Sequence, residues 1–187
     1  MQSDARPASP SGRMGGQMSD DEFLRAMNEH LELVYNLARR LTRSRLQAED
    51  LVQETYLRAL RGWRRQPPDD MRAWLATICL NAARAGWRSE SVRPVEVLDP
   101  DAGTTRTSHS DTAGEAISGL IRDQVHRALW QLPSAQREAI TLMDLCGFTA
   151  AEAAAMTGTP RGTILARVHR GHKKLVELLQ RQGVTSE

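Results

Sequence analysis

The apolar residues of this chain recur every three or four positions, which is the spacing of one face of an α-helix. The first run extends from Leu24 to Leu41, and later runs begin near Leu51, Ile117 and Ile164. The composition also favours helices, because the chain has 23 Ala and 21 Leu but only 14 Val and Ile combined. Ala and Leu favour helices, whereas β-branched residues favour strands. We therefore predict an all-α protein.

Two stretches without apolar periodicity divide the chain. Residues 1–18 are rich in Ser, Pro and Gly, so we expect a disordered leader there. Residues 91–111 contain two prolines and a Thr/Ser cluster, so we expect a flexible linker. Residues 19–90 and 112–187 are then two small helical domains. A linker of about 20 residues reaches at most roughly 66 Å, which is close to two turns of B-DNA at about 34 Å each.

Three helices are expected in the first domain. A capping-box pattern at Ser19 and Glu22 precedes a first helix that continues to Leu41. The second is expected over about 47–62, with an inward face of Leu51, Val52, Thr55, Tyr56, Ala59 and Trp63. The third is expected over about 70–89, with an inward stripe of Met71, Trp74, Ile78, Ala82 and Ala85.

The second domain is dense in helix-start patterns. They are the capping boxes Thr112/Glu115 and Thr149/Glu152, and Pro133-Ser134, which should stop one helix and cap the next. After a short Ala-rich helix, Gly158 supplies a turn, Thr159 an N-cap and Pro160 a first helical residue. A short helix, a Gly turn and a longer basic helix are typical of a helix-turn-helix.

The last helix concentrates positive charge. From Pro160 to Arg181, six basic residues stand against one acidic residue, although the whole chain is only +2. The inward face should be Ile164, Val168, Gly171 and Leu175, and the outward side Arg161, Gly162, Thr163, Ala166, His169, Arg170 and Lys173. Alone, this pattern also fits a solvated basic face. The preceding short helix and Gly turn favour a helix that enters the major groove, with Arg161 and Arg167 at base edges and Arg170 and Lys173 at phosphates.

The second helix presents an unusual outward face. It holds Asp50, Gln53, Glu54, Leu57 and Arg61. A leucine among acidic residues suggests a protein-binding surface, but single exposed leucines are also ordinary on soluble proteins. The residues alone leave both interpretations open.

Three segments together resemble a known family. AEDLVQETYLRA (48–59) resembles the core-polymerase-binding segment of bacterial sigma factors of the sigma-70 family, extracytoplasmic-function (ECF) group. RAWLATICLNAA (72–83) is similar to the segment that meets the promoter −10 element. LPSAQREA (132–139), GFTAAEAA (147–154) and GTILARVHR (162–170) resemble the domain that recognises the −35 element. The resemblance covers residues 20–181.

The resemblance implies a role for each surface. It implies that core RNA polymerase binds Asp50, Gln53, Glu54 and Leu57. The −10 element would meet Met71, Asn81, Arg84 and Arg88, with Asn81 holding a flipped base. The −35 element would meet Arg161, Thr163, Ala166, Arg167, Arg170 and Lys173. The resemblance also makes an anti-sigma factor a possible further partner. The sequence departs from the family at Met71, where an aromatic residue is common, and at Gly171-His172, which replace Ala-Arg.

Other classes of function find little support. We see no phosphate loop or nucleophile motif, so no enzyme and no cofactor are expected. The five histidines lack partners at metal spacing, and Cys79 and Cys146 fit small buried residues. The longest central uncharged run has 11 residues, too short to span a membrane, and without a secretion signal we expect a cytoplasmic protein. The alternative is an activator with an N-terminal sensor and a C-terminal helix-turn-helix, which would bind DNA without polymerase.

Overall fold

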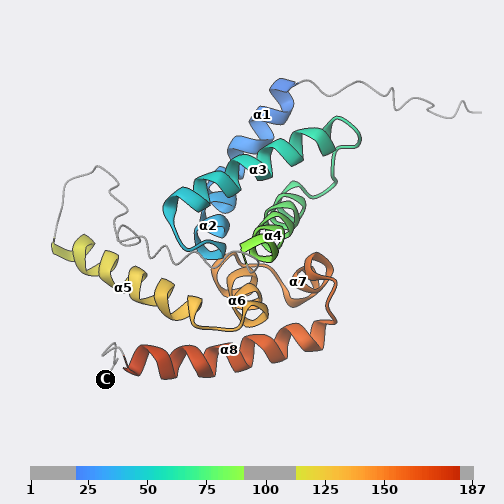
Figure 1. Cartoon of the computed structure of the whole chain (residues 1–187). Coiled ribbons are helices and arrows are strands. Elements are labelled where there is room, and N and C mark those ends of the chain that lie inside the picture. The colour runs from blue at the N-terminus through green and yellow to red at the C-terminus, as the bar shows by residue number, and fades with distance from the viewer. Residues whose placement is uncertain (1–19, 91–112, 182–187) are drawn as a thin grey trace, which may run out of the picture.

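The structure is a computed structural model that describes residues 20–90 and 113–181, with side chains described over 21–87 and 121–181. The predicted leader and linker lie outside these ranges. Within them the chain is helical, which confirms the all-α prediction (Figure 1). The elements are α1 (Asp20–Glu29), α2 (Leu31–Leu41), α3 (Arg45–Trp63), α4 (Met71–Glu90), α5 (Ala113–Trp130), α6 (Ser134–Ile140), a π-helical turn η1 (Thr141–Leu145), α7 (Ala150–Thr157) and α8 (Arg161–Arg181).

The described chain falls into a first half, residues 20–90, and a second half, residues 113–181. Helices α2, α3 and α4 form the centre of the first half, and α1 contacts α2 and α3. The predicted single helix up to Leu41 is wrong, because the chain breaks at His30, whose ψ of 8° is not helical. Because of this break, a different set of side chains faces inward from the one that a single helix would bury. Phe23 and Met27 are buried, with the Phe23 ring 5.7 Å from that of Trp63, whereas Leu24 and Leu31 are exposed.

Helix α3 follows the prediction closely. It begins at Arg45, two residues before the predicted start, because Ser44 accepts a hydrogen bond from the Gln47 backbone N–H and the Gln47 side chain completes a capping box. Of its expected inward residues, Leu51, Thr55, Ala59 and Trp63 are buried, and Val52 and Tyr56 are partly buried. The face that remains outside is therefore the predicted one.

Helix α4 differs from the prediction in its inward face. Of the predicted stripe, Ala82 is buried, but Met71, Trp74, Ile78 and Ala85 are only partly buried. Leu75, Ala76, Cys79 and Leu80, which were not predicted, are completely inaccessible. The physical reason is that α4 is covered on two sides, by α2 and α3 of its own half and by α7 of the other half. A single amphipathic stripe cannot describe a helix with two buried faces.

In the second half, α8 lies against α5, α6 and α7. The capping box of Thr149 and Glu152 is confirmed, and Gly158 ends α7 in the left-handed conformation with φ of 62°. Ser134 does not cap α6, contrary to expectation, because it is the first helical residue and Pro133 occupies the cap position without a side-chain hydrogen bond. The Thr112/Glu115 pattern lies outside the described side chains.

The two halves share one apolar core. Leu37, Leu51 and Leu80 of the first half belong to the same buried cluster as Leu142 and Phe148 of the second. Figure 1 shows α4 beside α6 and α7. The chain thus packs its halves against each other in this structure, and the domain boundaries predicted at 90 and 112 stay predictions.

Candidate functional site

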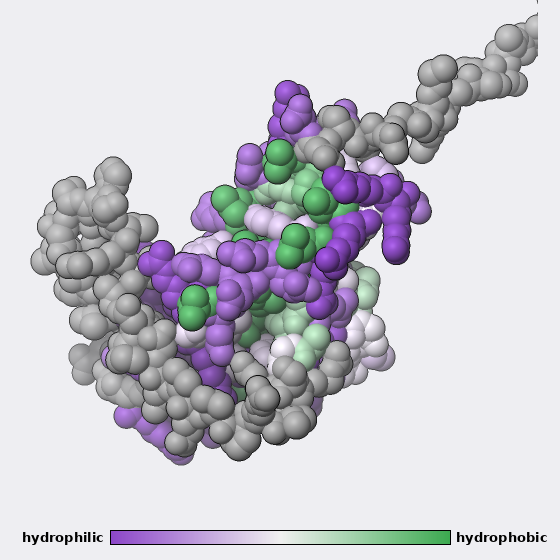
Figure 2. Space-filling view, turned by 45° about the horizontal axis from the view of Figure 1, so that its top comes forward, coloured by the Kyte–Doolittle hydropathy of each residue, from purple (hydrophilic) through white to green (hydrophobic). Residues whose placement is uncertain are grey.

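The outward face of α3 combines acidic and apolar groups. Asp50 and Gln53 are exposed, and Leu57 has 52% of its surface accessible. Glu54 is partly buried, and its Oε1 lies 2.6 Å from Nε of Arg58 one turn further on. On the side drawn in Figure 2, isolated apolar residues stand among hydrophilic ones. This face can therefore bind a partner that offers both a cation and an apolar contact.

The residues expected at the −10 element do not gather at one point. Asn81 is exposed near the middle of α4, and its amide can both donate and accept hydrogen bonds. Met71 is partly buried at the start of the same helix, where it packs against the cluster that contains Trp63. Ten residues separate the two, or about 15 Å along a helix axis. The side chain of Arg88 lies outside the described residues.

Arg84, also expected at the −10 element, is already engaged. Its Nε donates to Oε1 of Glu138 at 3.1 Å, and its Nη2 contacts the second carboxylate oxygen. The Glu138 side chain is only 7% exposed. In this arrangement Arg84 joins α4 to α6 and is not available to DNA.

Helix α8 exposes the basic side that the sequence predicts. Arg161, Thr163, Arg170 and Lys173 are exposed, and Ala166 is partly buried. Arg167 is also partly buried, and its Nη1 donates to Oγ1 of Thr159 at 3.3 Å. Ile164, Val168 and Gly171 are buried as predicted. The arrangement of α7, the Gly158 turn and α8 is that of a helix-turn-helix, with the basic side of the second helix turned outward.

The departure at Gly171-His172 has a structural explanation. A Cβ atom on Gly171 would stand 2.6 Å from Cδ1 of Ile140, so any larger residue there would displace the Ile140 side chain at the crossing of α6 and α8. His172 is exposed, but its Nε2 lies 2.5 Å from a carboxylate oxygen of Asp144. It is therefore held by η1, which sequence reasoning did not predict.

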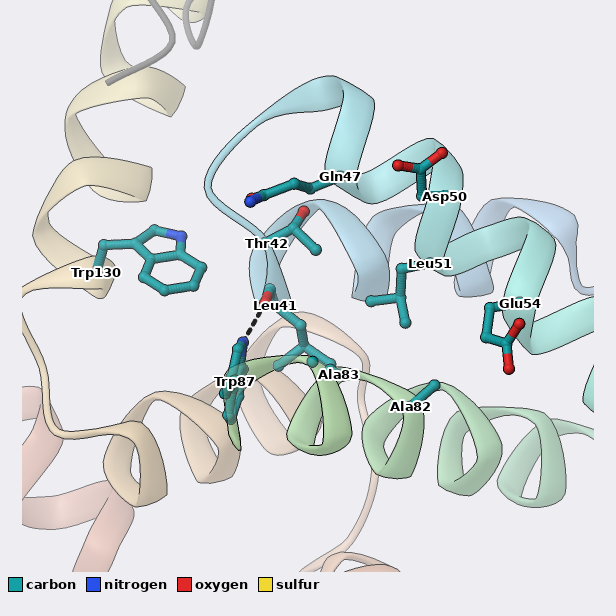
Figure 3. Close-up of a pocket in the computed structure, with 11 residues that line it drawn as sticks. Leu41, Thr42, Gln47, Asp50, Leu51, Glu54, Ala82, Ala83, Trp87 and Trp130 are labelled. Atoms are coloured by element: carbon teal, nitrogen blue, oxygen red, sulfur yellow. Dashed lines mark hydrogen bonds between the residues drawn. The ribbon is translucent and has the colours of Figure 1, made fainter. Parts of the chain in front are cut away.

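The sequence also gave no indication that Arg137 lies between two tryptophan rings. The Arg137 guanidinium stacks 3.8 Å from the centre of the Trp130 ring and 5.1 Å from that of Trp87. Figure 3 shows these two rings, which line a pocket between the halves. Burial lowers its pKa to about 10. Because Trp87 is on α4 and the other two residues belong to the second half, no local sequence pattern could have revealed the contact.

The described residues include no candidate metal cluster and two buried cysteines. No group of three His, Cys, Asp or Glu side chains within these ranges could hold a metal ion. Cys79 and Cys146 are free and buried, and burial raises the pKa of their thiols to about 12 and about 11. None of the described helices is long and apolar enough to cross a bilayer.

Comparisons with known proteins agree with this arrangement. Residues 26–93 match sigma-70 region 2, and residues 122–175 match sigma-70 region 4. The ECF RNA polymerase sigma factor EcfG of Rhodopseudomonas palustris is 41% identical over 137 residues, which are 73% of this chain and 73% of that protein. SigL of Mycobacterium tuberculosis, another ECF sigma factor, is 33% identical over 179 residues, or 91% of this chain and 97% of its own length.

Solved structures give the same result. The sigma factor RpoE of Bartonella quintana, solved in complex with the anti-sigma factor NepR, superimposes with a TM-score of 0.68 at 31% identity, covering 86% of this chain and 98% of its own. CnrH, solved with the cytosolic domain of CnrY, shares the fold, with a TM-score of 0.65 at 24% identity over 88% of this chain and 91% of its own.

The helix-turn-helix of α7 and α8, with the basic side of α8 turned outward, is the arrangement of a DNA-binding protein. Within that class, this chain belongs to the ECF group of the sigma-70 family. It is an RNA polymerase sigma factor, which binds core polymerase and directs promoter recognition and the initiation of transcription.

Proposed function

We propose that three separate surfaces divide the work of this sigma factor. Core polymerase binds Asp50, Gln53, Glu54 and Leu57 on α3. The −10 element binds α4 through Met71, Asn81, Arg84 and Arg88, and the −35 element binds α8 through Arg161, Thr163, Ala166, Arg167, Arg170 and Lys173. Residues 19–90 and 112–187 are the two domains that carry these surfaces.

The exposure of Asp50, Leu57 and Asn81 on two different helices is the observation that supports this division most strongly. A polymerase-binding residue and a base-binding residue on separate faces can act at the same time. Asn81 offers a donor and an acceptor to a base edge, which suits it to hold an unpaired base.

Promoter binding requires the two halves to separate. Arg84 can meet DNA only after it leaves Glu138, which belongs to the other half. The energy for opening the duplex comes from binding unstacked bases and from contacts within the holoenzyme. The protein performs no bond chemistry of its own, and it acts in the cytoplasm, where core polymerase works.

An anti-sigma factor is proposed as a further partner. The likeness to RpoE, which was solved with the anti-sigma factor NepR, supports this proposal. Such a partner would bind the packed form of the chain and keep it from core polymerase.

Two sets of substitutions test the division. Asp50→Ala combined with Leu57→Ala should reduce the pull-down of core polymerase, because a charge and an apolar anchor leave the patch. Asn81→Ala should leave that pull-down unchanged and reduce promoter opening, measured by permanganate reactivity of unpaired thymines. The division is wrong if Asn81→Ala abolishes polymerase binding or opens the promoter as well as the parent does.

A further inference from the structure

The turn between α7 and α8 (Figure 1) holds the hydroxyl of Thr159 in a defined place. Gly158 ends α7 in the left-handed conformation, with φ of 62°, and Pro160 follows Thr159 directly. The Thr159 backbone N–H donates a hydrogen bond to the Ala154 carbonyl oxygen at 3.1 Å. A proline also restricts the backbone of the residue before it. The backbone of Thr159 is therefore fixed from both sides, and its side chain starts from a fixed point.

Thr159 is not the N-cap of α8, contrary to the prediction from sequence. The Pro160 carbonyl oxygen accepts from the backbone N–H groups of Thr163 and Ile164, at 2.9 and 3.1 Å, so Pro160 occupies the cap position. The Thr159 hydroxyl instead donates to the Thr157 carbonyl oxygen at 3.4 Å. A hydroxyl has one donor and two acceptor lone pairs. The lone pairs of Oγ1 thus remain available to a donor from α8.

The donor that uses this acceptor is Arg167, in the second turn of α8. Its Nη1 donates to Oγ1 of Thr159 at 3.3 Å, across eight positions of sequence. No carboxylate of the described residues forms an ion pair with Arg167. Within the described ranges, the Thr159 hydroxyl is therefore the side-chain group that orients this guanidinium.

The contact with Thr159 leaves one edge of the Arg167 guanidinium for a base. An arginine carries five N–H donors in a planar fork. While Nη1 is bound to Thr159, Nε and Nη2 are still unoccupied by described residues, and a pair of arginine donors matches O6 and N7 of guanine in the major groove. A side chain that is already held in place also loses less freedom on binding.

We propose that Thr159 is a positioning residue for promoter recognition, which holds Arg167 so that its Nε–Nη2 edge meets a guanine of the −35 element. The inference rests on the proposed function, since it assumes that α8 lies in the major groove with Arg167 at a base edge. Thr159 acts through Arg167 and does not read a base itself. Its hydroxyl sets the direction of the guanidinium, and with it the selectivity for guanine at one position.

The test measures binding of holoenzyme, formed from the full chain and purified core polymerase, to a library of −35 variants. Arg167→Ala first identifies the position at which Arg167 confers a preference for guanine. Thr159→Val removes the hydroxyl and keeps the branched shape of the side chain. It should lower the preference for guanine at that position by about three- to tenfold, because a hydrogen bond to a charged group is lost. Thr159→Ser keeps the hydroxyl and should retain the preference of the parent.

Thr157→Val is the matched control. The Thr157 hydroxyl lies at the end of α7, where it donates to the Ala153 carbonyl oxygen at 2.7 Å and does not contact Arg167. This variant also loses one hydroxyl from the helix-turn-helix, but it should keep the guanine preference of the parent. A loss of preference in Thr159→Val alone therefore reports the orientation of Arg167 and not a general weakening of the turn.

A double variant shows whether Thr159 acts through Arg167. Thr159→Val combined with Arg167→Ala should have the same base preference as Arg167→Ala alone, because the hydroxyl then has no guanidinium to orient. A further loss of preference in the double variant would show that Thr159 contacts a base itself, contrary to the inference.

The inference would also be overturned by a guanine preference in Thr159→Val equal to that of the parent, or by an equal loss in Thr157→Val. In either case the effect of Arg167→Ala would persist, and the proposed role of α8 would stand. If Arg167→Ala itself changed no base preference, the proposed function of Arg167 would be wrong, and the inference about Thr159 would be wrong with it.

Discussion

Arg84 on α4 and Glu138 on α6 form an ion pair that joins the two halves of the molecule across 54 positions of sequence. Both side chains are largely withdrawn from solvent, with 26% and 7% of their surfaces exposed. The arginine that the −10 element would need is thus part of the contact that holds the halves together. If Arg84 contacts the −10 element as proposed, packing of the halves and promoter binding are alternatives.

Glu138→Gln should loosen the packing of the halves, because it removes the charge that holds Arg84. A hydrogen bond to a charged group is worth about 1.5–3 kcal/mol. Hydrogen exchange of the α4 amides should become faster in the variant. Glu49→Gln is the control, since Glu49 forms an exposed ion pair with Arg45 inside α3 and such pairs are worth about 0–1 kcal/mol. Equal protection of α4 in both variants would show that Arg84 and Glu138 do not hold the halves together.

Gly171→Ala should destabilise the second half by about 1–3 kcal/mol, because the new methyl group would overlap Ile140, a buried and β-branched residue. Thermal melting measures the effect. Gly162→Ala should instead stabilise the chain by up to about 1 kcal/mol, since its Cβ has open space. Combining Gly171→Ala with Ile140→Val should recover part of the loss. A melting temperature unchanged by Gly171→Ala would contradict the close crossing of α6 and α8.

The contacts of α8 with the −35 element should be of two kinds. Arg161→Ala or Arg167→Ala should relax base preference at particular positions, each costing about 1–3 kcal/mol. Lys173→Ala should weaken binding to all sequences about equally, because we expect Lys173 to contact phosphate, which carries no sequence information. Binding to a library of −35 variants, measured with holoenzyme, separates the two. Our orientation of α8 is wrong if Lys173→Ala changes base preference and the arginine substitutions do not.

Acid should weaken the contact that His126 of α5 makes with Arg39 of α2. Its Nε2 lies 2.9 Å from the Arg39 carbonyl oxygen. Burial lowers the pKa of His126 and outweighs that hydrogen bond, which acts in the opposite direction. The folded pKa is thus below the unfolded value of about 6.5, so the unfolded chain binds more protons. The contribution of neutral His126 to the free energy of unfolding is therefore complete above about pH 6.5 and is lost as the pH is lowered. In His126→Gln, the melting temperature should fall less between pH 7.5 and 5.5 than in the parent. An identical fall in melting temperature in both proteins would show that His126 is not the source of the acid sensitivity.

The local features of the fold could be predicted from sequence, and the long-range contacts could not. The Thr149/Glu152 capping box and the Gly158 turn depend on neighbouring residues, so the helix-turn-helix follows from the pattern. The inward face of α3 follows from its periodicity in the same way. The second buried face of α4 does not, because it exists only where α7 packs on it.

The same distinction holds for the candidate sites. Exposure of Asp50, Leu57 and Asn81 follows from helical geometry, whereas the partners of Arg84 and His172 are 54 and 28 positions away. No helical period connects residues so far apart. Arg84 is also the residue whose sequence-based role requires the packed halves to rearrange.

The most direct test of the account is run-off transcription with purified core polymerase, on a library of genomic promoters. The parent chain should stimulate initiation at a subset of promoters. Asp50→Ala with Leu57→Ala should reduce the signal through loss of polymerase binding, and Asn81→Ala should reduce it while polymerase binding persists. The account would be contradicted by the absence of stimulation on every promoter, together with tight sequence-specific binding of the free chain to promoter DNA at physiological salt.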